Sequence, residues 1–507
     1  MFCRILCADI CGINAHKVYV EADVSGGLPG FNIVGLPSSE VRESKERVTR
    51  AITNSGYDFP SRNITINLLP ASQKKFGSGF DLPIALAILC ATGQIEKNIL
   101  NDSLIIGELS LDGTVNPVNG ILSIASFAQK EKIKNLILSK ENAYEGAVIK
   151  DLNIIGVSSL KETVDILKSK EIPVWPHFDL EHLLEKAYQE CSLDYIDIKG
   201  QENAKRATMI AICGFHNLLY IGPPGSGKSM LSQRIPTILN RMSVDECLEV
   251  SKIYSVSGLL NGKSLILNRP FRAPHHSITD AALVGGLAIP RPGEITLANK
   301  GVLFLDEVAE FKKSTIEMLR QPLEDKHIQI SRASSVVDFP CDFMLVMAMN
   351  PCKCGYYPDR NFCKCTETEI RKYFGKIKGP ILDRVDITIG TKRLDTSDFS
   401  KETSGMSSSQ MRKLIKSAQE IQKERFKNLN ISFNSQMSKN EIETYCQLSK
   451  ENQEILNNAY NKFQMSARGY YKILKVARTI ADISQSKEIS KSNLLEAISY
   501  RNQFLDR

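Results

Sequence analysis

One glycine-rich segment has the residue types and spacing of a phosphate-binding loop. It follows the pattern G-x-x-x-x-G-K-[ST] and consists of Gly222, Pro223, Pro224, Gly225, Ser226, Gly227, Lys228 and Ser229. Small residues allow the backbone to curl so that its N–H groups face phosphate oxygens. An apolar run at 217–221 predicts a strand before the loop, and residues 230–239 can continue as a helix behind it. This context favours a nucleotide site over a chance glycine turn.

The end of this loop and a later acidic pair predict ATP and Mg²⁺ as ligands. Lys228 would neutralise the β and γ phosphate oxygens, and Ser229 offers a hydroxyl to Mg²⁺. A second apolar run at 302–305 ends in the carboxylates Asp306 and Glu307. At the C-terminal end of a buried parallel strand they can reach the same phosphates. We expect Asp306 to hold the Mg²⁺ shell and Glu307 to polarise the attacking water, rather than to cap a helix.

A third apolar run, at 343–349, ends in Asn350. Its amide would lie between the two nucleotide motifs if the three strands are neighbours, and it could then orient the attacking water. An asparagine after a strand says little by itself. As the third motif in this order, it is a candidate catalytic residue.

Four cysteines lie close together just after Asn350. They form two C-x-C pairs, Cys352 with Cys354 and Cys363 with Cys365, and eight residues lie between the pairs. Four thiolates on a short loop can close a tetrahedral Zn²⁺ site. An iron–sulfur cluster uses the same ligands, and two labile disulfides are a third alternative that a reducing cytosol disfavours. We prefer structural zinc. A Zn²⁺ ion bound by four thiolates has a net negative charge, which the lysines between the ligands would offset.

The composition is that of an ordinary globular protein. Of 507 residues 42% are hydrophobic and 24% charged, which excludes disorder, collagen and coiled coil for the whole chain. The formal net charge of +7 permits a polyanion partner without requiring one. We expect no signal peptide at the start of the sequence and no membrane-spanning helix, because no run of 18 apolar residues occurs. The scattered thiols suit a reducing cytoplasm.

The composition and periodicity of the sequence predict three folded segments and a linker. Residues 1–170 alternate β-rich runs with turns, residues 171–189 contain two prolines and the only tryptophan, and residues 190–395 alternate strand and helix, which predicts a parallel α/β sheet. Residues 396–507 contain no proline and have helical periodicity, which predicts a helical bundle. In the first segment we predict strands at 18–24, 63–69 and 104–106 and helices at 42–54 and 82–91; in the last, helices at 411–428, 439–461, 468–485 and 491–504.

These motifs together carry a family resemblance over essentially the whole chain. The chain resembles the magnesium-chelatase-like AAA+ ATPases of the YifB/ComM group, most specifically at 269–276 (RPFRAPHH), 290–294 (PRPGE), 379–386 (GPILDRVD) and 466–470 (SARGY). The resemblance implies a multidomain α/β protein with a Lon-protease/S5-like N-terminal domain, an AAA+ P-loop core and a C-terminal helical lid. It also implies a homo-oligomeric ring, expected to be a hexamer, with ATP bound between neighbours.

The resemblance assigns roles to two arginines. Arg384 matches the arginine that each subunit supplies in trans to its neighbour's ATP, a contribution of about 10³–10⁵ in rate where it operates. Its alternative role is a surface ion pair with Asp383 or Asp386. Arg468, at the start of a predicted helix of the lid, matches the second sensor, which contacts the γ-phosphate from the lid.

A predicted β-hairpin is the candidate DNA contact. Residues 326–339 alternate in period two on both sides of 333–335, and the family's hairpin at this place faces the ring pore. Arg332 is then the main candidate for a phosphate contact, with Lys326 and His327 as weaker ones, and such a site would be strongly salt-dependent. The alternative is that the hairpin packs against the next subunit. His275 and His276 have the residue type of a metal pair, but adjacent residues of a strand point to opposite faces and would not bind one ion together. We therefore expect a structural or interfacial role for them.

The N-terminal segment lacks the residues of a Lon-type protease. Aligning the flanking motifs places Gly79 at the nucleophile and Leu122 at the lysine, whereas Ser–Lys catalysis needs a hydroxyl and a base within hydrogen-bond reach. Ser78 is one residue away, and Lys74 or Lys75 would have to act as the base from another place. We therefore expect a scaffold or partner-binding role.

The leading functional hypothesis is an ATP-driven ring motor that acts on single-stranded or branched DNA, as a helicase or branch-migration enzyme in the recombination of natural transformation. A magnesium-chelatase-type remodeller of a protein or metal-insertion partner is the alternative, and an ATP-dependent protease is a third. Stimulation of the ATPase by DNA, by a tetrapyrrole-system partner or by unfolded protein would distinguish them.

Overall fold

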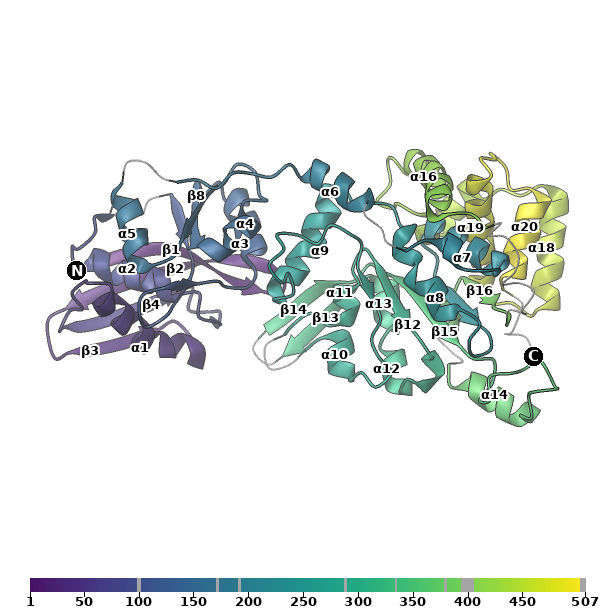
Figure 1. The fold of residues 1–507 in the computed structure, drawn as a ribbon, viewed down its shortest axis with the longest axis horizontal. Coiled ribbons are helices and arrows are strands. Elements are labelled where there is room, and N and C mark those ends of the chain that lie inside the picture. The colour runs from purple at the N-terminus through teal and green to yellow at the C-terminus, as the bar shows by residue number, and fades with distance from the viewer. Residues whose placement is uncertain are drawn as a thin grey trace.

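The computed structural model describes residues 1–97, 102–169, 173–189, 193–286, 290–332, 335–377, 381–393 and 405–501. The molecule is elongated, with one sheet near the N-terminus, a second sheet in the middle and a group of helices at the far end (Figure 1). The multidomain α/β class is confirmed. Among the helices of these ranges, none has the length and apolarity needed to cross a membrane.

The N-terminal sheet has seven strands in the order β3-β4-β2-β1-β5-β8-β9. The strands are β1 (Phe2–Cys11), β2 (Asn14–Ser25), β3 (Gly30–Val34), β4 (Asn63–Leu69), β5 (Ser103–Ile105), β8 (Asn135–Ser139) and β9 (Asn153–Val157), and β6 (Glu108–Leu109) pairs with β7 (Val115–Asn116) outside this sheet. The helices are α1 (Ser39–Asn54), α2 (Asp81–Ala91), α3 (Ile121–Lys130), α4 (Ala143–Gly146) and α5 (Leu160–Lys168). The predicted strands and helices of this region are all present. Every residue of α2 is buried, which explains why its sequence is apolar on all sides.

The predicted linker is more ordered than its prolines suggested. It contains helix α6 (Leu180–Gln189), whose Leu180 and Leu184 are buried. The indole of Trp175 lies edge-on to the ring of Tyr144, with 4.7 Å between the ring centroids. The segment therefore packs against the N-terminal region on its way to the central sheet.

The central sheet has five parallel strands in the order β11-β12-β15-β10-β16. Its strands are β10 (Leu218–Ile221), β11 (Phe271–Arg272), β12 (Val302–Leu305), β15 (Met344–Met349) and β16 (Ile387–Gly390), and β13 (His327–Arg332) and β14 (Ser335–Pro340) form a separate hairpin. The helices around it are α7 (Glu202–Gly214), α8 (Lys228–Gln233), α9 (Val244–Val256), α10 (Asp280–Val284), α11 (Glu294–Leu297), α12 (Lys313–Glu317), α13 (Arg320–Asp325) and α14 (Glu367–Gly375). The predicted parallel sheet is confirmed.

The helix behind the phosphate loop is shorter than predicted. Helix α8 ends at Gln233, and a 3-10 turn, Ile235–Thr237, replaces the expected continuation to residue 239. Pro236 lies in this turn. Since proline has no N–H to donate and its ring clashes with the preceding turn, the α-helix stops before it.

The N-terminal region is fixed to the core through α9, which packs against α3. Glu145 of α4 is buried and accepts hydrogen bonds from the Ser255 hydroxyl of α9 and from the backbone N–H of Leu122, the latter at 2.9 Å. Leu122 is itself fully buried. The position that would carry the Lon-type lysine therefore lies in the buried interface between the N-terminal region and the core.

The C-terminal helices are α16 (Ser408–Arg425), α17 (Lys439–Tyr445), α18 (Lys450–Lys462), α19 (Ala467–Ile483) and α20 (Lys491–Ser499). The helix predicted at 439–461 is two helices, because Ser449 caps α18 by accepting from the N–H of Asn452. The helix predicted at 491–504 ends at Ser499, and residues 502–507 lie outside the described residues.

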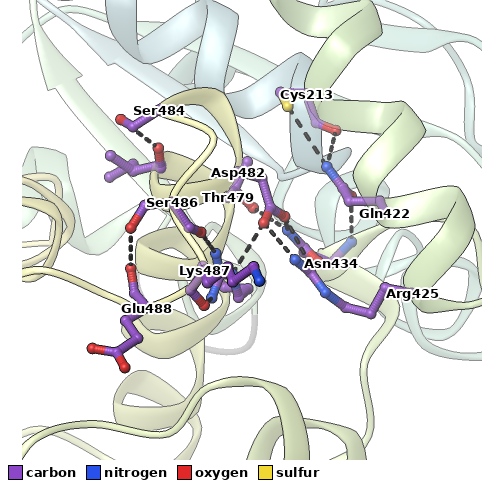
Figure 2. A network of polar contacts seen from close by, with 12 residues as sticks. Cys213, Gln422, Arg425, Asn434, Thr479, Asp482, Ser484, Ser486, Lys487 and Glu488 are labelled. Atoms are coloured by element: carbon purple, nitrogen blue, oxygen red, sulfur yellow. Dashed lines mark hydrogen bonds and ion pairs between the residues drawn. The ribbon is translucent and has the colours of Figure 1, made fainter.

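A buried polar network fixes these helices to each other and to the core (Figure 2). Asp482 of α19 is fully buried and accepts from Nη1 of Arg425 (2.7 Å) and Nδ2 of Asn434 (2.8 Å). Gln422 of α16 donates to the backbone oxygen of Cys213 in α7 at 3.1 Å. The same helices share one hydrophobic cluster with the central sheet, so the helical part and the core are packed as one body.

Candidate active site

Three sequence motifs meet at the carboxyl edge of the central sheet. The phosphate loop follows β10, the acidic pair follows β12, and Asn350 follows β15. Because β10 and β12 lie on either side of β15, the three strand ends are adjacent. The crevice outside the carboxyl ends of parallel strands is where sheets of this kind bind ligands.

The phosphate loop curls at two glycines with left-handed backbone. Gly225 has φ 73° and Gly227 has φ 85°, values that residues with a side chain rarely adopt. Lys228 begins α8 directly behind them, and its Nζ donates to the backbone oxygens of Gly222 (2.7 Å) and Pro223 (2.9 Å). The ammonium group is thus held inside the turn of the loop, where phosphate oxygens would compete for its protons.

Asn350 lies where the sequence placed it. Its Oδ1 accepts a hydrogen bond from Nζ of Lys228 at 3.1 Å, which joins the third motif to the first. Burial lowers the pKa of Lys228, and the negative charges of Asp306 and Glu307 oppose this shift. Lys228 is 9% exposed, so its ammonium group is largely removed from water. Electrostatic interactions of this group with a phosphate would therefore be stronger than in water.

The residues expected to hold Mg²⁺ are also in contact. The hydroxyl of Ser229 donates to Oδ2 of Asp306 at 2.7 Å. A hydroxyl beside a carboxylate offers hard oxygen ligands of the kind that Mg²⁺ prefers, with room left for water and substrate phosphates. The residues therefore fit the ion that their sequence motif implied.

Glu307 turns the chain sharply after β12. Its backbone is left-handed, with φ 49°, which is uncommon for a residue with a side chain and concentrates at functional sites. Its N–H donates to Oδ1 of Asp306 at 2.9 Å. A cavity of about 340 Å³ opens beside these groups and is lined by Ser229, Asp306 and Glu307, among others.

Two histidines also line this cavity, and here the sequence argument was wrong. We expected His275 and His276 to lie on opposite faces of a strand, but β11 ends at Arg272. The two residues are in the loop that follows, where strand alternation does not apply, and their ring centroids are only 4.0 Å apart. Both rings lie on the cavity that holds Glu307.

Arg384 and Arg468 meet at a different place from the phosphate loop. Arg384 is 7% exposed and its guanidinium pairs with Glu324 of α13, not with Asp383 or Asp386. Nη2 of Arg468 lies 3.3 Å from the same carboxylate. Burial lowers the pKa of Arg384, and the charge of Arg468 adds to that shift.

The direction of β16 separates these arginines from the phosphate loop of their own chain. Arg384 precedes β16, whereas Thr391 follows it and hydrogen-bonds Ser226 of the phosphate loop, with 2.7 Å between the two hydroxyl oxygens. The four-residue strand spans about 13 Å at about 3.3 Å per residue. Arg384 therefore lies at the amino edge of the sheet and the phosphate loop at the carboxyl edge.

The four cysteines converge as the sequence predicted. Their sulfur atoms all lie within 4.8 Å of one another. Three Sγ–Sγ distances are 3.2 Å (Cys352–Cys354), 3.7 Å (Cys352–Cys363) and 3.6 Å (Cys354–Cys363). A disulfide bond would need about 2.05 Å, while a tetrahedron with Zn–S bonds of about 2.3 Å has edges of about 3.8 Å. The geometry fits a tetrahedral metal site better than disulfides.

The predicted hairpin is present, with β13 and β14 in antiparallel register from His327 opposite Pro340 to Arg332 opposite Ser335. Nζ of Lys326 lies 3.0 Å from the carboxylate of Asp342, so its charge is already paired. The side chain of Arg332 lies outside what the structure describes.

The Lon-type residues do not assemble. The hydroxyl of Ser78 donates to Glu108, and Nζ of Lys75 donates to the backbone oxygens of Pro70 and, at 2.8 Å, Gln73. Lys74 is exposed. The candidate hydroxyl and the candidate base thus have other partners.

Comparison with known proteins agrees with this architecture. Three family models match in turn: Subunit ChlI of Mg-chelatase at 20–142, Magnesium chelatase, subunit ChlI, at 194–399, and its C-terminal model at 405–501. The competence protein ComM of Haemophilus influenzae is 40% identical over 495 residues, which is 97% of this chain and 95% of that protein. Protein YifB of Escherichia coli is 40% identical over 491 residues, with the same coverage. A Lon protease of Syntrophus aciditrophicus is 26% identical over 168 residues, 30% of this chain and 21% of that protein.

The matches cover the N-terminal region, the central sheet and the C-terminal helices, and two relatives align over nearly their whole length. The chain belongs to the YifB/ComM family of magnesium-chelatase-like AAA+ ATPases.

Proposed function

We propose that this protein hydrolyses ATP with Mg²⁺ and couples hydrolysis to movement on DNA. The observation that carries the ATPase is the meeting of Lys228, the Ser229–Asp306 pair, Glu307 and Asn350 at one sheet edge. In this mechanism Lys228 leaves its backbone partners for the β and γ oxygens. Ser229 and Asp306 hold the ion, which supplies charge neutralisation at the phosphates.

Hydrolysis itself is assigned to the groups around the attacking water. Glu307 orients and polarises the water, and its turned backbone directs the chain around the cavity beside Asp306. The amide of Asn350 accepts from Lys228 through its oxygen, and in this mechanism its nitrogen helps to orient the same water. Such positioned groups act mainly by geometry and electrostatics, because phosphoryl transfer leaves little covalent chemistry to the protein.

We also propose that the subunits form a ring, a hexamer in the simplest case, and that Arg384 and Arg468 act on the neighbour's nucleotide. The separation of Arg384 from its own phosphate loop by the length of β16 supports this reading. Arg468 shares Glu324 with Arg384, so the two arginines would approach the neighbour's phosphates together. Glu324 would release them when the neighbour binds ATP.

DNA, single-stranded or branched, is the proposed substrate, and helicase or branch-migration activity in recombination during natural transformation is the proposed role. The support is the likeness to a competence protein and the hairpin at β13–β14 that carries Arg332. A chelatase-type remodeller of proteins or of metal insertion is the second candidate, supported by the matching magnesium chelatase models. The free thiols of the described residues support the cytoplasm as its location.

The test is the ATPase rate with Mg²⁺, measured with and without single-stranded and forked DNA, beside the Glu307→Gln variant. We expect DNA to stimulate the ATPase rate several-fold. We expect the Glu307→Gln variant to lose ATPase activity both with and without DNA. An ATPase that is lost in the variant but indifferent to every DNA would favour the remodeller. An ATPase that survives in the variant would refute the site.

We propose that the four cysteines bind a Zn²⁺ ion. Two of them, Cys352 and Cys363, are buried, and the backbone N–H of Tyr357 donates to Sγ of Cys352 at 3.4 Å, a contact that suits a thiolate. Metal analysis of the purified protein should give about one zinc per chain. Iron in place of zinc would assign a cluster, and no metal would refute the site.

A further inference from the structure

The four-cysteine loop, residues 352–365, lies against the ATP site. The chain leaves β15 at Met349, and only Pro351 separates Asn350 from the first ligand, Cys352. Met349, Cys352 and Cys363 belong to one buried hydrophobic cluster. Any displacement of the loop is therefore passed to Asn350 through a single proline, whose ring fixes its own φ angle.

The same loop also touches the phosphate loop directly. Gly355 has φ 88°, and a Cβ added there would lie 2.6 Å from Cδ of Pro224 and 3.9 Å from Cγ of Asn350. The backbone at Gly355 thus covers Pro224 at a distance that no side chain would permit. Glycine is required here both by the left-handed backbone and by this close approach.

The far end of the loop leads to a third part of the site. Cys365 is followed by Thr366, which caps α14. From α14, Tyr373 packs in the hydrophobic cluster that contains Cys352 and Cys363. Directly after α14, Lys376 pairs at 3.5 Å with Glu310, which lies three residues beyond Glu307. The loop is therefore in contact, directly or through one neighbour, with the segments that carry all three nucleotide motifs.

The two ends of the loop are joined where the four cysteines converge, and Arg360 adds a hydrogen bond to the backbone oxygen of Cys365 (2.7 Å) and an ion pair with Glu367. The loop has no helix or strand between Asn350 and α14. Its internal contacts are short-range, such as the N–H of Gly355 to the oxygen of Cys352 (3.0 Å) and the N–H of Cys363 to the oxygen of Asp359 (2.8 Å). A metal bound by all four sulfurs would join the two ends of the loop at one point, which is how structural zinc sites stabilise short segments.

We propose that the metal-bound four-cysteine loop is a positioning element for ATP hydrolysis: it holds Gly355 over Pro224 and fixes the amide of Asn350 beside Lys228. The proposal rests on the proposed ATPase and zinc site and adds the coupling between them. Loss of the metal would leave the nucleotide motifs in the chain but free Asn350 and the phosphate loop to shift. A misplacement of about 1 Å in such a site can lower the rate about a hundredfold.

Three variants separate the coupling from its premises. Cys365→Ser removes a partly exposed ligand. Gly355→Ala keeps all four ligands but disturbs the contact with Pro224. Cys11→Ser replaces an exposed cysteine of the N-terminal region and is the matched control. For each variant and the wild type, we would measure metal per chain, melting temperature, kcat for ATP, and the affinity for Mg·ADP by calorimetry.

We expect Cys365→Ser to lose most of its metal and about tenfold or more in kcat, and Gly355→Ala to keep its metal but lose about as much. Cys11→Ser should match the wild type in every measurement. Wild-type kcat and nucleotide affinity in a metal-free Cys365→Ser protein or in Gly355→Ala would overturn the coupling. A metal-free wild type would overturn the metal site. If the wild type did not hydrolyse ATP, the proposed ATPase would fail, and the Mg·ADP affinity of Gly355→Ala would still decide whether the loop positions the site.

Discussion

The assignment of Arg384 to the neighbour's ATP can be tested by mixing two inactive proteins. In Arg384→Ala every nucleotide site lacks its trans arginine. In Glu307→Gln every site lacks the group that polarises the water. When the two are mixed, a site made by an Arg384→Ala chain and completed by a neighbouring Glu307→Gln chain contains both groups.

The magnitude follows from the arrangement in the ring. Arg384→Ala alone should lose about 10³–10⁵ in rate, the range for a missing trans arginine, and Glu307→Gln alone should be inactive because its water is no longer polarised. In a random equal mixture, half of the sites have an intact Glu307, and half of those have a neighbour with an intact Arg384. About a quarter of the interfaces is therefore complete, and we expect about a quarter of the wild-type ATPase if the sites act independently.

The control is a mixture of Glu307→Gln with Lys228→Ala. Both changes disable the phosphate-loop side of a site, so no combination of neighbours restores one. The rates are measured after subunits have been mixed under dissociating conditions and reassembled. If the Arg384→Ala mixture were no more active than this control, Arg384 would not act in trans, and our reasoning from the polarity of β16 would be refuted.

Three further predictions concern other parts of the chain. Arg332→Ala should weaken DNA binding and lower its salt dependence while basal ATPase is kept. Lys326→Ala is the control and should change DNA binding little, because the charge of Lys326 is already paired within the chain. Titrations with DNA at several salt concentrations check both. Asp482→Ala removes a fully buried carboxylate to which the half-buried Arg425 and the buried Arg478 both donate, and it should cost about 3 kcal/mol of unfolding free energy, measured by denaturant unfolding. Burial raises the pKa of Asp9 to about 7, so the folded chain keeps a proton there that the unfolded chain releases at about pH 4. Stability from this group is then lost as pH rises from about 4 to about 7. Asp9→Asn should therefore raise the melting temperature relative to wild type at pH 8 more than at pH 4; an equal effect at both would contradict it.

The sequence was sufficient for the nucleotide site because its information is local. Each motif directly follows an apolar strand, and parallel strands bring their carboxyl ends to one edge, so Lys228, Asp306 and Asn350 could be placed without a structure. The convergence of the cysteines followed likewise from their spacing within fourteen residues, 352–365.

What the sequence could not provide depends on contacts between distant segments or on where an element stops. Nothing near Arg384 in the sequence indicates Glu324, 60 residues earlier, as its partner. The short β11 could not be distinguished from a longer strand, and this led to the wrong orientation for His275 and His276. The break between α17 and α18 depends on a single capping serine, Ser449, within an otherwise continuous helical pattern.

The N-terminal region is better understood as a scaffold than as a protease that has lost its catalytic residues. The position of a Lon-type lysine is filled by Leu122, under the buried contact between Glu145 and Ser255 of α9. At another point a Cβ on Gly12 would lie 2.6 Å from Val337 of the β13–β14 hairpin, so the turn after β1 packs against strand β14 of the element proposed to contact DNA. A Lon-type site at Leu122 would have to open the contact between Glu145 and Ser255, whereas a scaffold that holds the hairpin relative to α9 needs both contacts closed. The packing therefore supports the scaffold, and it ties the orientation of the β13–β14 hairpin, the proposed DNA contact, to the N-terminal sheet.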